Sequence, residues 1–440
     1  MGRTGKWIVA IALMLIVGSL LTPVVYVIGL ANRGRAVDRE IARIRAAGEP
    51  VSTADLAGRP IPDGENAALV YLKCLSLLPR SPRSPDSGLL RDFLRPERRA
   101  QDPKLWGKTK VMLDRYRGVL SMAEKAAAMP KCRYPVDRAT SAGFGSDRLR
   151  GLRQLVRYAA AQALVESKNG RADAAIRHIK LAYRIAEPLK DERVESSQRV
   201  VYSCIESASD AVKGSAALVW ISESQARSVA SAIDRLDLRD SVRYSLLGKR
   251  AAGITFYAGV ERGDVAALGA ENTGSGKMFK RLSSSLPGRI WLYSDELYYL
   301  SEMRRYLELA HTPYRIRKAR VTDPGPDVPQ YALFASLLIP SVDTALWAAD
   351  HASADNAGSR IFLGLLAYRD RFRSYPASLD ELKAKLSWRL PDDPFSGRPF
   401  IYRKQGKGFL LYSVGDDLKD DHGIETARNG SGDIVWRLSR

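Results

Sequence analysis

The sequence predicts a mostly helical α+β protein, with an N-terminal transmembrane helix, a helical middle domain and a C-terminal helix packed on a small antiparallel sheet. Three observations predict this fold class. Residues 7–31 are apolar without interruption, and apolar residues recur at spacings of three and four from Leu149 to about Lys213. Short aromatic and β-branched runs separated by Gly or Asp clusters follow residue 399.

The apolar stretch from Trp7 to Ala31 is long enough to cross a membrane. Its 25 residues would reach about 37 Å as a helix, whereas a bilayer core is about 30 Å thick. A signal peptide is the competing interpretation, because Gly29-Leu30-Ala31 is a small-residue cleavage site, but the stretch exceeds a usual signal-peptide apolar region. We therefore expect residues 1–6 to be a cytoplasmic tail and residues 7–31 an uncleaved anchor.

The middle of the chain predicts helices. We expect residues 32–148 to form a membrane-proximal region of helices and loops, beginning with a short basic helix at 36–47. Residues 149–321 follow as a helical domain that contains a hairpin turning at 168–171, where Asn169-Gly170 breaks the apolar repeat. The hairpin looks like a tetratricopeptide unit, but no second copy follows at a 34-residue period. A plain helical hairpin and a repeat-type peptide groove both remain as interpretations.

Two further helices are expected within this domain, at 222–236 and at 291–309. The tyrosines of the second helix could line a groove or form a packing face with hydroxyl groups at its edge. They are Tyr293, Tyr298, Tyr299 and Tyr306.

The segment 322–329 predicts a linker, because its three prolines and one glycine cannot continue a helix. The C-terminal domain would then span residues 330–440. Residues 331–349 are apolar enough to suggest a second membrane span. However, Pro340 and Asp343 lie inside this stretch, and a charge in a short apolar segment is costly in lipid. A buried helix is the better prediction.

The C-terminal domain has clear local signals. A helix should stop near Ser374-Tyr375-Pro376, because the residue before proline disfavours the helical region. Ser378 is placed to cap a second short helix, with Glu381 at the position that completes a capping box. The runs 400–402, 409–414 and 434–436 predict three antiparallel strands.

Four motifs in this domain occur in a fixed order. They are Tyr375-Pro376-Ala377-Ser378-Leu379-Asp380-Glu381-Leu382, Leu390-Pro391-Asp392-Asp393-Pro394-Phe395-Ser396-Gly397, Leu411-Tyr412-Ser413-Val414-Gly415-Asp416-Asp417 and Gly432-Asp433-Ile434-Val435-Trp436. In this order the motifs resemble the C-terminal half of the type II secretion major pseudopilins. The resemblance implies a pseudopilin-like head of one helix on a small sheet, with a loop that holds calcium in that family.

A second resemblance covers both ends of the chain. The segment 48–71, together with the Tyr-Pro-Ala-Ser-Leu-Asp-Glu-Leu motif, resembles a group of uncharacterised bacterial membrane-anchored envelope proteins, which implies no activity. A prepilin would need a short basic leader and a glutamate within the apolar stretch, and neither occurs here. We therefore do not expect an assembled pilus subunit.

The loop between the second and third expected strands is dense in carboxylates. Calcium takes six to eight oxygen ligands, so such a loop could hold this ion, or it could be a solvated acidic turn. The resemblance matches Ser413, Asp417 and Asp433 to the calcium ligands of the family, and Asp420 and Asp421 have no secure counterpart. The candidate calcium site therefore consists of Ser413, Asp417, Asp433, Asp420 and Asp421. An EF-hand is excluded, because its Asp-x-Asp-x-Asp-Gly spacing is absent.

The orientation of the chain follows from two arguments. Five arginines follow the apolar stretch, and the positive-inside rule would place them on the cytoplasmic side of the membrane. However, long C-terminal domains cross membranes largely regardless of charge. The pseudopilin-like head implies an extracytoplasmic location. We therefore expect a single-pass protein of the cytoplasmic membrane whose C-terminal part is periplasmic.

The net charge of +20, from 69 basic and 49 acidic residues, predicts either a generally basic, soluble surface or attraction to anionic surfaces. Lipid headgroups and anionic envelope polymers are the expected partners besides an unknown envelope protein. We expect no specific nucleic acid, because the arginines are dispersed and no recognition module occurs. The cysteines Cys74, Cys132 and Cys204 are far apart, so at most one pair could form a disulfide.

No motif predicts an enzyme. The four histidines are isolated, and Gly274-Ser275-Gly276-Lys277 lacks both the first glycine and the final Ser or Thr of a phosphate-binding loop. We expect a membrane-anchored extracytoplasmic structural or interaction protein without catalytic residues or an organic cofactor. An accessory component of a secretion or pilus-like system is one alternative. An extracytoplasmic hydrolase that uses the acidic loop is the other.

Overall fold

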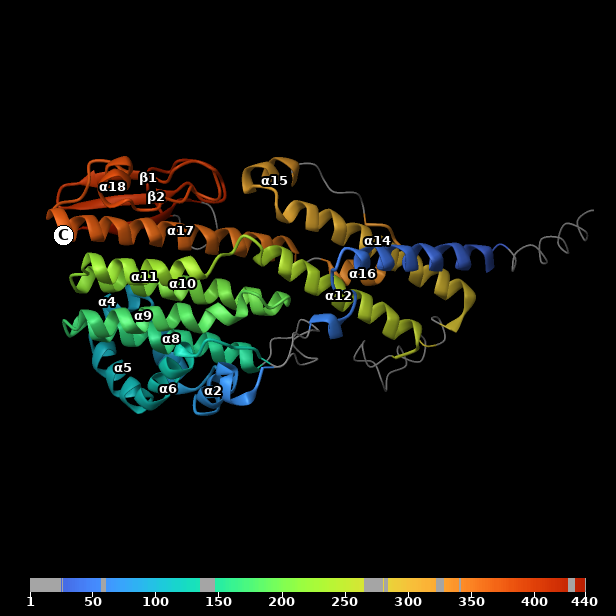
Figure 1. The fold of residues 1–440 in the computed structure, drawn as a ribbon, viewed down its shortest axis with the longest axis horizontal. Coiled ribbons are helices and arrows are strands. Elements are labelled where there is room, and N and C mark those ends of the chain that lie inside the picture. Colours follow the sequence, from blue (N-terminus) through green and yellow to red (C-terminus); the bar gives the residue numbers. More distant parts are fainter. Residues whose placement is uncertain are drawn as a thin grey trace, which may run out of the picture. The chain divides into compact units, whose positions relative to one another are not determined.

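The computed structural model of the chain describes residues 25, 27–56, 61–134, 147–264, 280, 284–321, 328–339, 342–425 and 432–439. These residues are mostly helical, with one small antiparallel sheet near the C-terminus, as the sequence predicts (Figure 1). The chain divides into two compact units. Unit 1 comprises Met1–Leu56, Leu247–Glu308 and Pro324–Val342, and unit 2 comprises Ala57–Leu246, Leu309–Asp323 and Asp343–Arg440.

This division differs from the boundaries expected from the sequence. The segment 149–321 is shared between the two units, and the C-terminal sheet belongs to the same unit as the helical hairpin. Contacts between distant segments explain the difference. Ser359 lies 2.7 Å from Ser209, and the side-chain amide of Asn356 donates to the carbonyl of Leu236. Proline-rich composition marks a break in a helix, but packing decides which helices form one unit.

Unit 2 contains most of the helices. In chain order they are α2 (Ala67–Ser76), α3 (Pro85–Leu94), α4 (Pro96–Gln101), α5 (Lys104–Arg115), α6 (Arg117–Ala128), α8 (Asp147–Lys168), α9 (Ala172–Ala186), α10 (Glu195–Leu218), α11 (Glu223–Arg235), α15 (Tyr314–Val321), α17 (Val342–Phe372, from Asp343 on) and α18 (Leu379–Leu386), with the 3₁₀ turns η2 (Asp63–Glu65) and η3 (Glu187–Leu189).

The predicted hairpin is confirmed by α8 and α9. Gly170 supplies the positive φ of 75° that the tight turn between the two helices requires. The facing sides of these helices are rich in Ala, including the fully buried Ala159, Ala160 and Ala182, so their backbones can approach closely. Helix α11 is also confirmed, and Ser222 and Gln225 form a capping box at its start.

The predicted strands are confirmed as β1 (Ile401–Gln405), β2 (Gly408–Ser413) and β3 (Ile434–Leu438), in the order β1-β2-β3. The sheet packs on α17, and Figure 1 shows the two side by side. A Cβ atom on Gly358 of α17 would lie only 2.3 Å from the ring of Trp436, so glycine makes room for this indole. Phe362 and Phe409 extend the same contact, with ring centroids 5.5 Å apart.

The expected capping box of α18 is only half formed. The hydroxyl of Ser378 accepts a hydrogen bond from the backbone N–H of Glu381 at 3.2 Å, as predicted. The carboxylate of Glu381, however, accepts from the N–H of Ala377 at 2.6 Å and from the hydroxyl of Tyr368. The prediction of a reciprocal box was therefore wrong, because the neighbouring N–H and the tyrosine compete for the same carboxylate.

Unit 1 contains a helix at 27–46, the 3₁₀ turn η1 (Thr53–Leu56), α12 (Ser241–Glu261, from Leu247 on), α14 (Leu286–Ala310, to Glu308) and α16 (Leu333–Leu338). Its core is aromatic: Phe334 of α16 contacts Phe256 and Trp291, with ring centroids 5.1 and 5.4 Å apart. Tyr299 is fully buried and donates to the carbonyl of Lys249. This tyrosine therefore belongs to a packing face.

Among the residues that the structure describes, no helix is both long and apolar enough to cross a membrane. The expected anchor at 7–31 lies largely outside the described residues, which begin at 25. The apolar stretch 331–349 was expected to form one buried helix, and this was wrong. Helix α16 ends at Leu338, α17 begins at Val342, and Leu337 is 73% exposed. All three cysteines carry free thiols.

Candidate functional site

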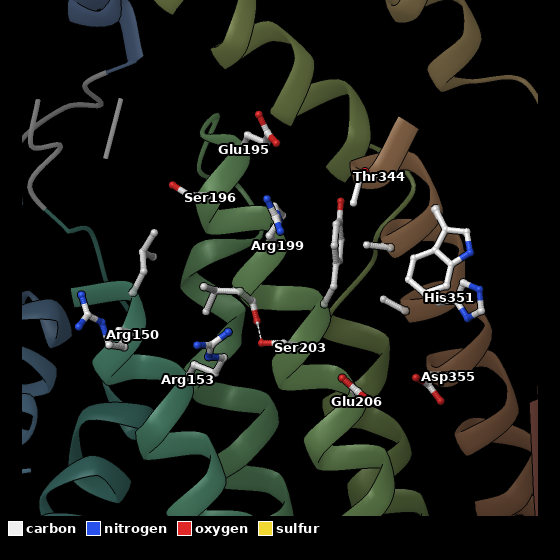
Figure 2. A pocket seen from close by; sticks show the side chains of 16 residues that line it. Arg150, Arg153, Glu195, Ser196, Arg199, Ser203, Glu206, Thr344, His351 and Asp355 are labelled. Atoms are coloured by element: carbon white, nitrogen blue, oxygen red, sulfur yellow. Dashed lines mark hydrogen bonds between the residues drawn. The ribbon is translucent and has the colours of Figure 1, made fainter. Parts of the chain in front are cut away.

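Two cavities of unit 2 adjoin along helix α10. The first has a volume of about 630 Å³ and is lined by α8, α10 and α17. The second, of about 1090 Å³, is lined by the α3–α5 region, α8, α10 and the segments 423–425 and 435–437. Glu206 lines both cavities, so we treat them as one site and call it the α10 trough. Figure 2 shows the first cavity.

The floor of the trough is the polar face of an amphipathic helix. Val201, Ile205 and Val212 of α10 are fully buried against the rest of unit 2. Glu206 and Asp210, one turn apart, face away from that core and remain exposed. This is the usual 3.6-residue pattern of a surface helix, except that cavity walls rise on both sides of its polar face.

One wall of the trough is basic. Arg150, Arg153 and Arg157 follow one another at spacings of three and four, which places them on one face of α8. Arg91 of α3 and Arg199 of α10 complete the cluster, which we call the arginine wall. Figure 2 shows Arg153 and Arg199 directed into the first cavity from two helices.

Most of the arginine wall has no carboxylate within ion-pair distance among the described residues. Arg150 pairs with Asp147 at 2.9 Å, but no ion pair or side-chain hydrogen bond joins Arg91, Arg153, Arg157 or Arg199 to another residue within the described ranges. Burial lowers the pKa of Arg157, and the positive charges of Arg153 and Arg91 lower that pKa further. Neighbouring like charges raise the free energy of the molecule, and the charge of Glu206 offsets only part of this effect at Arg157.

The floor and the α17 side of the trough are acidic, and one lysine compensates part of this negative charge. Glu206 and Asp210 of α10 and Asp355 of α17 surround Lys213, whose Nζ lies 3.0 Å from Asp210. Desolvation raises the pKa of Asp355 to about 7, and the negative charges of Asp210 and Glu206 add to that rise. Desolvation and Asp210 also raise the pKa of Glu206. Figure 2 shows Glu206 and Asp355 at the same end of the cavity, on facing helices.

An aromatic edge closes the first cavity. Trp347 and His351, one turn apart on α17, place their rings 4.0 Å apart. Burial lowers the pKa of His351, so its imidazole is neutral at pH 7. Trp347 also donates its indole N–H to Asp416 at 2.9 Å, and this contact connects the edge of the trough with the acidic loop.

Basic residues outnumber acidic ones among the side chains that line the trough. The nine basic residues are Arg91, Arg95, Arg99, Arg150, Arg153, Arg157, Arg199, Lys213 and Arg437. The six acidic residues are Glu97, Glu195, Glu206, Asp210, Asp355 and Glu425. The pKa of Asp355, about 7, reduces the negative charge further near neutral pH, so the trough carries a net positive charge.

The structure places the five expected calcium ligands around the ends of β2 and β3. Ser413 ends β2, next to Ile434 in the sheet register, so it lies near Asp433. Asp420 accepts hydrogen bonds from the hydroxyl of Tyr412 and from the N–H of His422. Asp417 accepts a hydrogen bond from the N–H of Lys419. The fifth expected ligand, Asp421, follows Asp420 in the same loop.

These residues fit a cation only in part. Ser413 donates its hydroxyl to Asp393 at 2.7 Å, so this oxygen is already engaged. Asp433 is 4% exposed, and its Oδ1 has no hydrogen-bond partner among the described residues. Burial raises the pKa of Asp433, and the charges of Asp420 and Asp421 contribute to the rise. No group of three or more acidic, His or Cys side chains in the described chain is arranged to hold a metal ion.

Sequence reasoning did not find the α10 trough. Its arginines come from α3, α8 and α10, and its acids from α10 and α17, so no short motif contains them. One signal was available: Arg150, Arg153 and Arg157 share one face of α8, whereas Leu152, Leu155 and Val156 are fully buried on the other side of the helix. A row of arginines beside a core face, with no acidic residue four positions away, indicates a charge that needs a partner elsewhere.

Comparisons with known proteins identify no relative. No family model matches the chain, and neither a curated protein nor a solved structure matches it. Inferences about function therefore depend on the arrangement of the residues themselves.

Proposed function

We propose that this chain is a membrane-anchored binding protein, and that the α10 trough of unit 2 binds a linear anionic polymer of the cell envelope. One observation carries the proposal. The positive charges of Arg91 and Arg153 act on Arg157, which is half-buried while the other two are exposed, and none of the three has an ion-pair partner in the described part of the chain. On this proposal the protein binds its ligand and does not transform it.

The chemistry of the arginine wall supports an anionic ligand. Guanidinium groups present planar pairs of N–H donors that match phosphate and carboxylate groups. A bound anion would offset the mutual repulsion of Arg153 and Arg157, so binding and relief of repulsion act in the same direction. Asp210 cannot serve this purpose for the wall, because it already pairs with Lys213.

The dimensions of the trough support a polymer. Its floor is the 24-residue helix α10, about 36 Å long. The arginines are distributed along this length, with Arg150 and Arg199 in the first cavity and Arg91 and Arg157 in the second. A single small anion could neutralise only one of these positions, whereas a chain with repeated phosphate or carboxylate groups could contact several at once.

The sequence supports a location at the membrane. The apolar stretch 7–31 has the length of a membrane span, and the chain carries a net charge of +20. We place the two units on the periplasmic side of the cytoplasmic membrane, where anionic polymers and lipid headgroups are the available anionic surfaces.

The test is a binding titration of the full chain in detergent micelles. Labelled polyphosphate and polyglutamate serve as probes, with uncharged dextran as the negative control. The double variant Arg153→Gln/Arg157→Gln should bind both polyanions about tenfold or more weakly, because charged hydrogen bonds contribute about 1.5–3 kcal/mol each.

Arg239→Gln is the matched control for this titration. Arg239 is also in unit 2, but it is 86% exposed and pairs with Asp237 outside the trough. Its variant should bind like the wild type. Equal polyanion binding by the double variant and the wild type would refute the proposal, as would equal binding of dextran and polyphosphate.

A second candidate function is calcium binding by the C-terminal acidic loop. The buried Oδ1 of Asp433, without a hydrogen-bond partner among the described residues, favours it. Asp433, Asp420 and Asp421 would contribute carboxylates, and calcium would supply the charge that offsets their repulsion. Calcium should then raise the melting temperature of the wild type, a chelator should reverse the rise, and Asp433→Ala should abolish it. No shift at millimolar calcium would leave a solvated acidic turn.

A further inference from the structure

Unit 1 exposes a compact set of large apolar side chains. Val328, Tyr331, Leu333 and Leu337 are 54%, 46%, 45% and 73% exposed. Residues 328–339 contain no charged side chain. Single exposed apolar residues are common on soluble proteins, but an uncharged segment with four of them in ten residues indicates a contact surface. We call Val328–Leu338 the apolar segment.

The apolar segment is held firmly by its inner side. The carboxylate of Asp295 on α14 is fully buried and accepts hydrogen bonds from the N–H groups of Phe334 and Ala335 at 2.7 and 2.9 Å. Phe334 also packs against Trp291, with ring centroids 5.4 Å apart. Because Phe334 and Ala335 face inward, Leu333 and Leu337, which are one turn apart, share the outward face.

The part of α14 that contacts α16, residues 290–295, also contacts the N-terminal helix. Ile290 packs over Gly29, and the guanidinium of Arg33 donates to the hydroxyl of Ser294 at 2.6 Å. The apolar stretch of the sequence ends between these positions, at Ala31. The apolar segment and the end of the apolar stretch therefore lie at the same level along α14.

The N-terminal helix also exposes apolar side chains before this level. Val25, Val27 and Ile28 are 65%, 51% and 54% exposed, and the sequence before them is apolar back to Trp7. This helix exposes apolar side chains and is joined in sequence to an apolar stretch long enough to span a membrane. We therefore expect it to contact lipid. In unit 2, by contrast, exposed apolar residues such as Leu69, Val111 and Ile424 are scattered.

We propose that the apolar segment lies in the membrane interface beside the anchor, with Leu333 and Leu337 inserted below the lipid headgroups. Tyr331 suits this position, because tyrosine places an apolar ring and a polar hydroxyl across the interface. Asp295 fixes the depth of insertion by holding α16 to α14. This inference rests on the proposed membrane anchor, and it adds a second contact that sets how unit 1 meets the lipid surface.

The test measures the depth of single labels in the full chain. The protein is reconstituted into vesicles of phosphatidylethanolamine and phosphatidylglycerol that contain a quencher on a shallow acyl position. An environment-sensitive fluorophore is attached to Leu337→Cys in a Cys132→Ser background, since Cys74 and Cys204 are buried. Ala46→Cys is the control, because Ala46 is exposed in the same unit but about 22 Å along the helix from Ala31.

The label at position 337 should be quenched about twofold or more relative to the label at position 46. Equal quenching of the two labels would overturn the inference. Flotation of the same vesicles separates this result from failure of the anchor. If the chain floats with the vesicles and the labels are quenched equally, the anchor stands without an interfacial segment. If the chain does not float, both proposals fail. Circular dichroism of each variant checks that substitution preserves the fold.

Discussion

Units 1 and 2 leave opposite kinds of side chain exposed at their surfaces. Unit 2 collects arginines in the wall of a trough, whereas unit 1 exposes leucines and a tyrosine on a short uncharged segment. Either feature raises the free energy of an isolated molecule in water, the first by like-charge repulsion and the second by apolar exposure. On the two proposals, these features would meet different neighbours: a polyanion at the arginine wall and a lipid surface at the apolar segment.

The two units also differ in how they hold their smallest element. Unit 2 fixes its sheet to α17 through the buried indole of Trp436 over Gly358. Unit 1 fixes α16 to α14 through the buried carboxylate of Asp295. An aromatic contact depends on apolar burial and close packing, whereas a carboxylate contact depends on matched hydrogen bonds. Substitutions at these two positions should therefore have different consequences.

The largest effect is expected from Trp436→Ala. Removing a fully buried indole leaves a cavity against Gly358 and should lower the free energy of unfolding of unit 2 by about 3–5 kcal/mol. Chemical denaturation followed by circular dichroism measures this loss. Trp220→Ala is the matched control, because that indole is 42% exposed and its loss should cost less. Equal losses for the two variants would contradict the packing of the sheet on α17.

Asp295→Ala should have the next largest effect. The substitution leaves the hydroxyl of Tyr257 and the N–H groups of Phe334 and Ala335 without their acceptor. A buried unsatisfied donor costs about 1–3 kcal/mol, so unit 1 should lose about 3 kcal/mol or more. Hydrogen exchange should show faster exchange in α16. Asp295→Asn keeps one acceptor oxygen and should lose less. Unchanged exchange in α16 would show that Asp295 does not hold this helix.

Polyanion binding by the trough should strengthen as pH falls. The pKa of Asp355 is about 7, so this carboxyl group gains a proton between pH 8 and pH 6 and the trough becomes more positive. Polyphosphate affinity should therefore increase several-fold over this interval, and a titration at fixed ionic strength measures it. Asp355→Asn should bind more tightly at pH 8 and respond less to pH. Affinity that is constant or rises with pH would contradict this electrostatic account.

Protonation of Asp355 also affects the stability of the folded protein. The pKa of Asp355 is raised in the folded protein from an ordinary value of 3.8, so the folded state keeps a proton that the unfolded chain has already lost. Its stabilising contribution is complete below pH 3.8 and is lost as pH rises through about 7. Asp355→Asn should therefore melt at a higher temperature than the wild type at pH 8, with little difference near pH 4. The opposite order at pH 8 would contradict the raised pKa.

The smallest effect is expected from Ser222→Ala at the start of α11. Ser222 accepts a hydrogen bond from the N–H of Gln225 in a complete capping box. Loss of this cap should cost about 1 kcal/mol, well below the loss for Trp436→Ala. Ser231→Ala changes an exposed serine within α11 that does not cap the helix and serves as the control in the same denaturation experiment. Equal losses for both serines would show that the cap has no specific role.

Local elements were predictable from the sequence because their signals are local. Gly170 marks the turn of the hairpin, Ser222 and Ser378 mark helix starts, and the aromatic runs mark the strands. The helices α2 to α6 were expected only as a region of helices and loops, since their apolar faces are short. Unit boundaries were not predictable, because contacts such as that between Ser209 and Ser359 join residues 150 positions apart.

The candidate site was less predictable than the fold. The dispersed arginines predict only a generally basic surface, because nothing in the sequence shows that Arg91 approaches Arg157. The sequence shows that the acidic loop is dense in carboxylates, but it does not show which groups these carboxylates contact. Ser413 engages Asp393, twenty positions earlier, and Asp416 accepts a hydrogen bond from Trp347. Whether acids converge depends on turn geometry, which residue spacing does not determine.

The salt dependence of polyphosphate binding tests the central claim most directly. Each anionic group that an arginine neutralises releases counterions, so the logarithm of affinity falls linearly with the logarithm of salt concentration. The full chain and its Arg153→Gln/Arg157→Gln variant are titrated over a series of salt concentrations. The account predicts that the slope becomes shallower in the double variant by about 1.5, the value for two lost contacts. Identical slopes for the two proteins would show that the arginine wall does not contact the polymer.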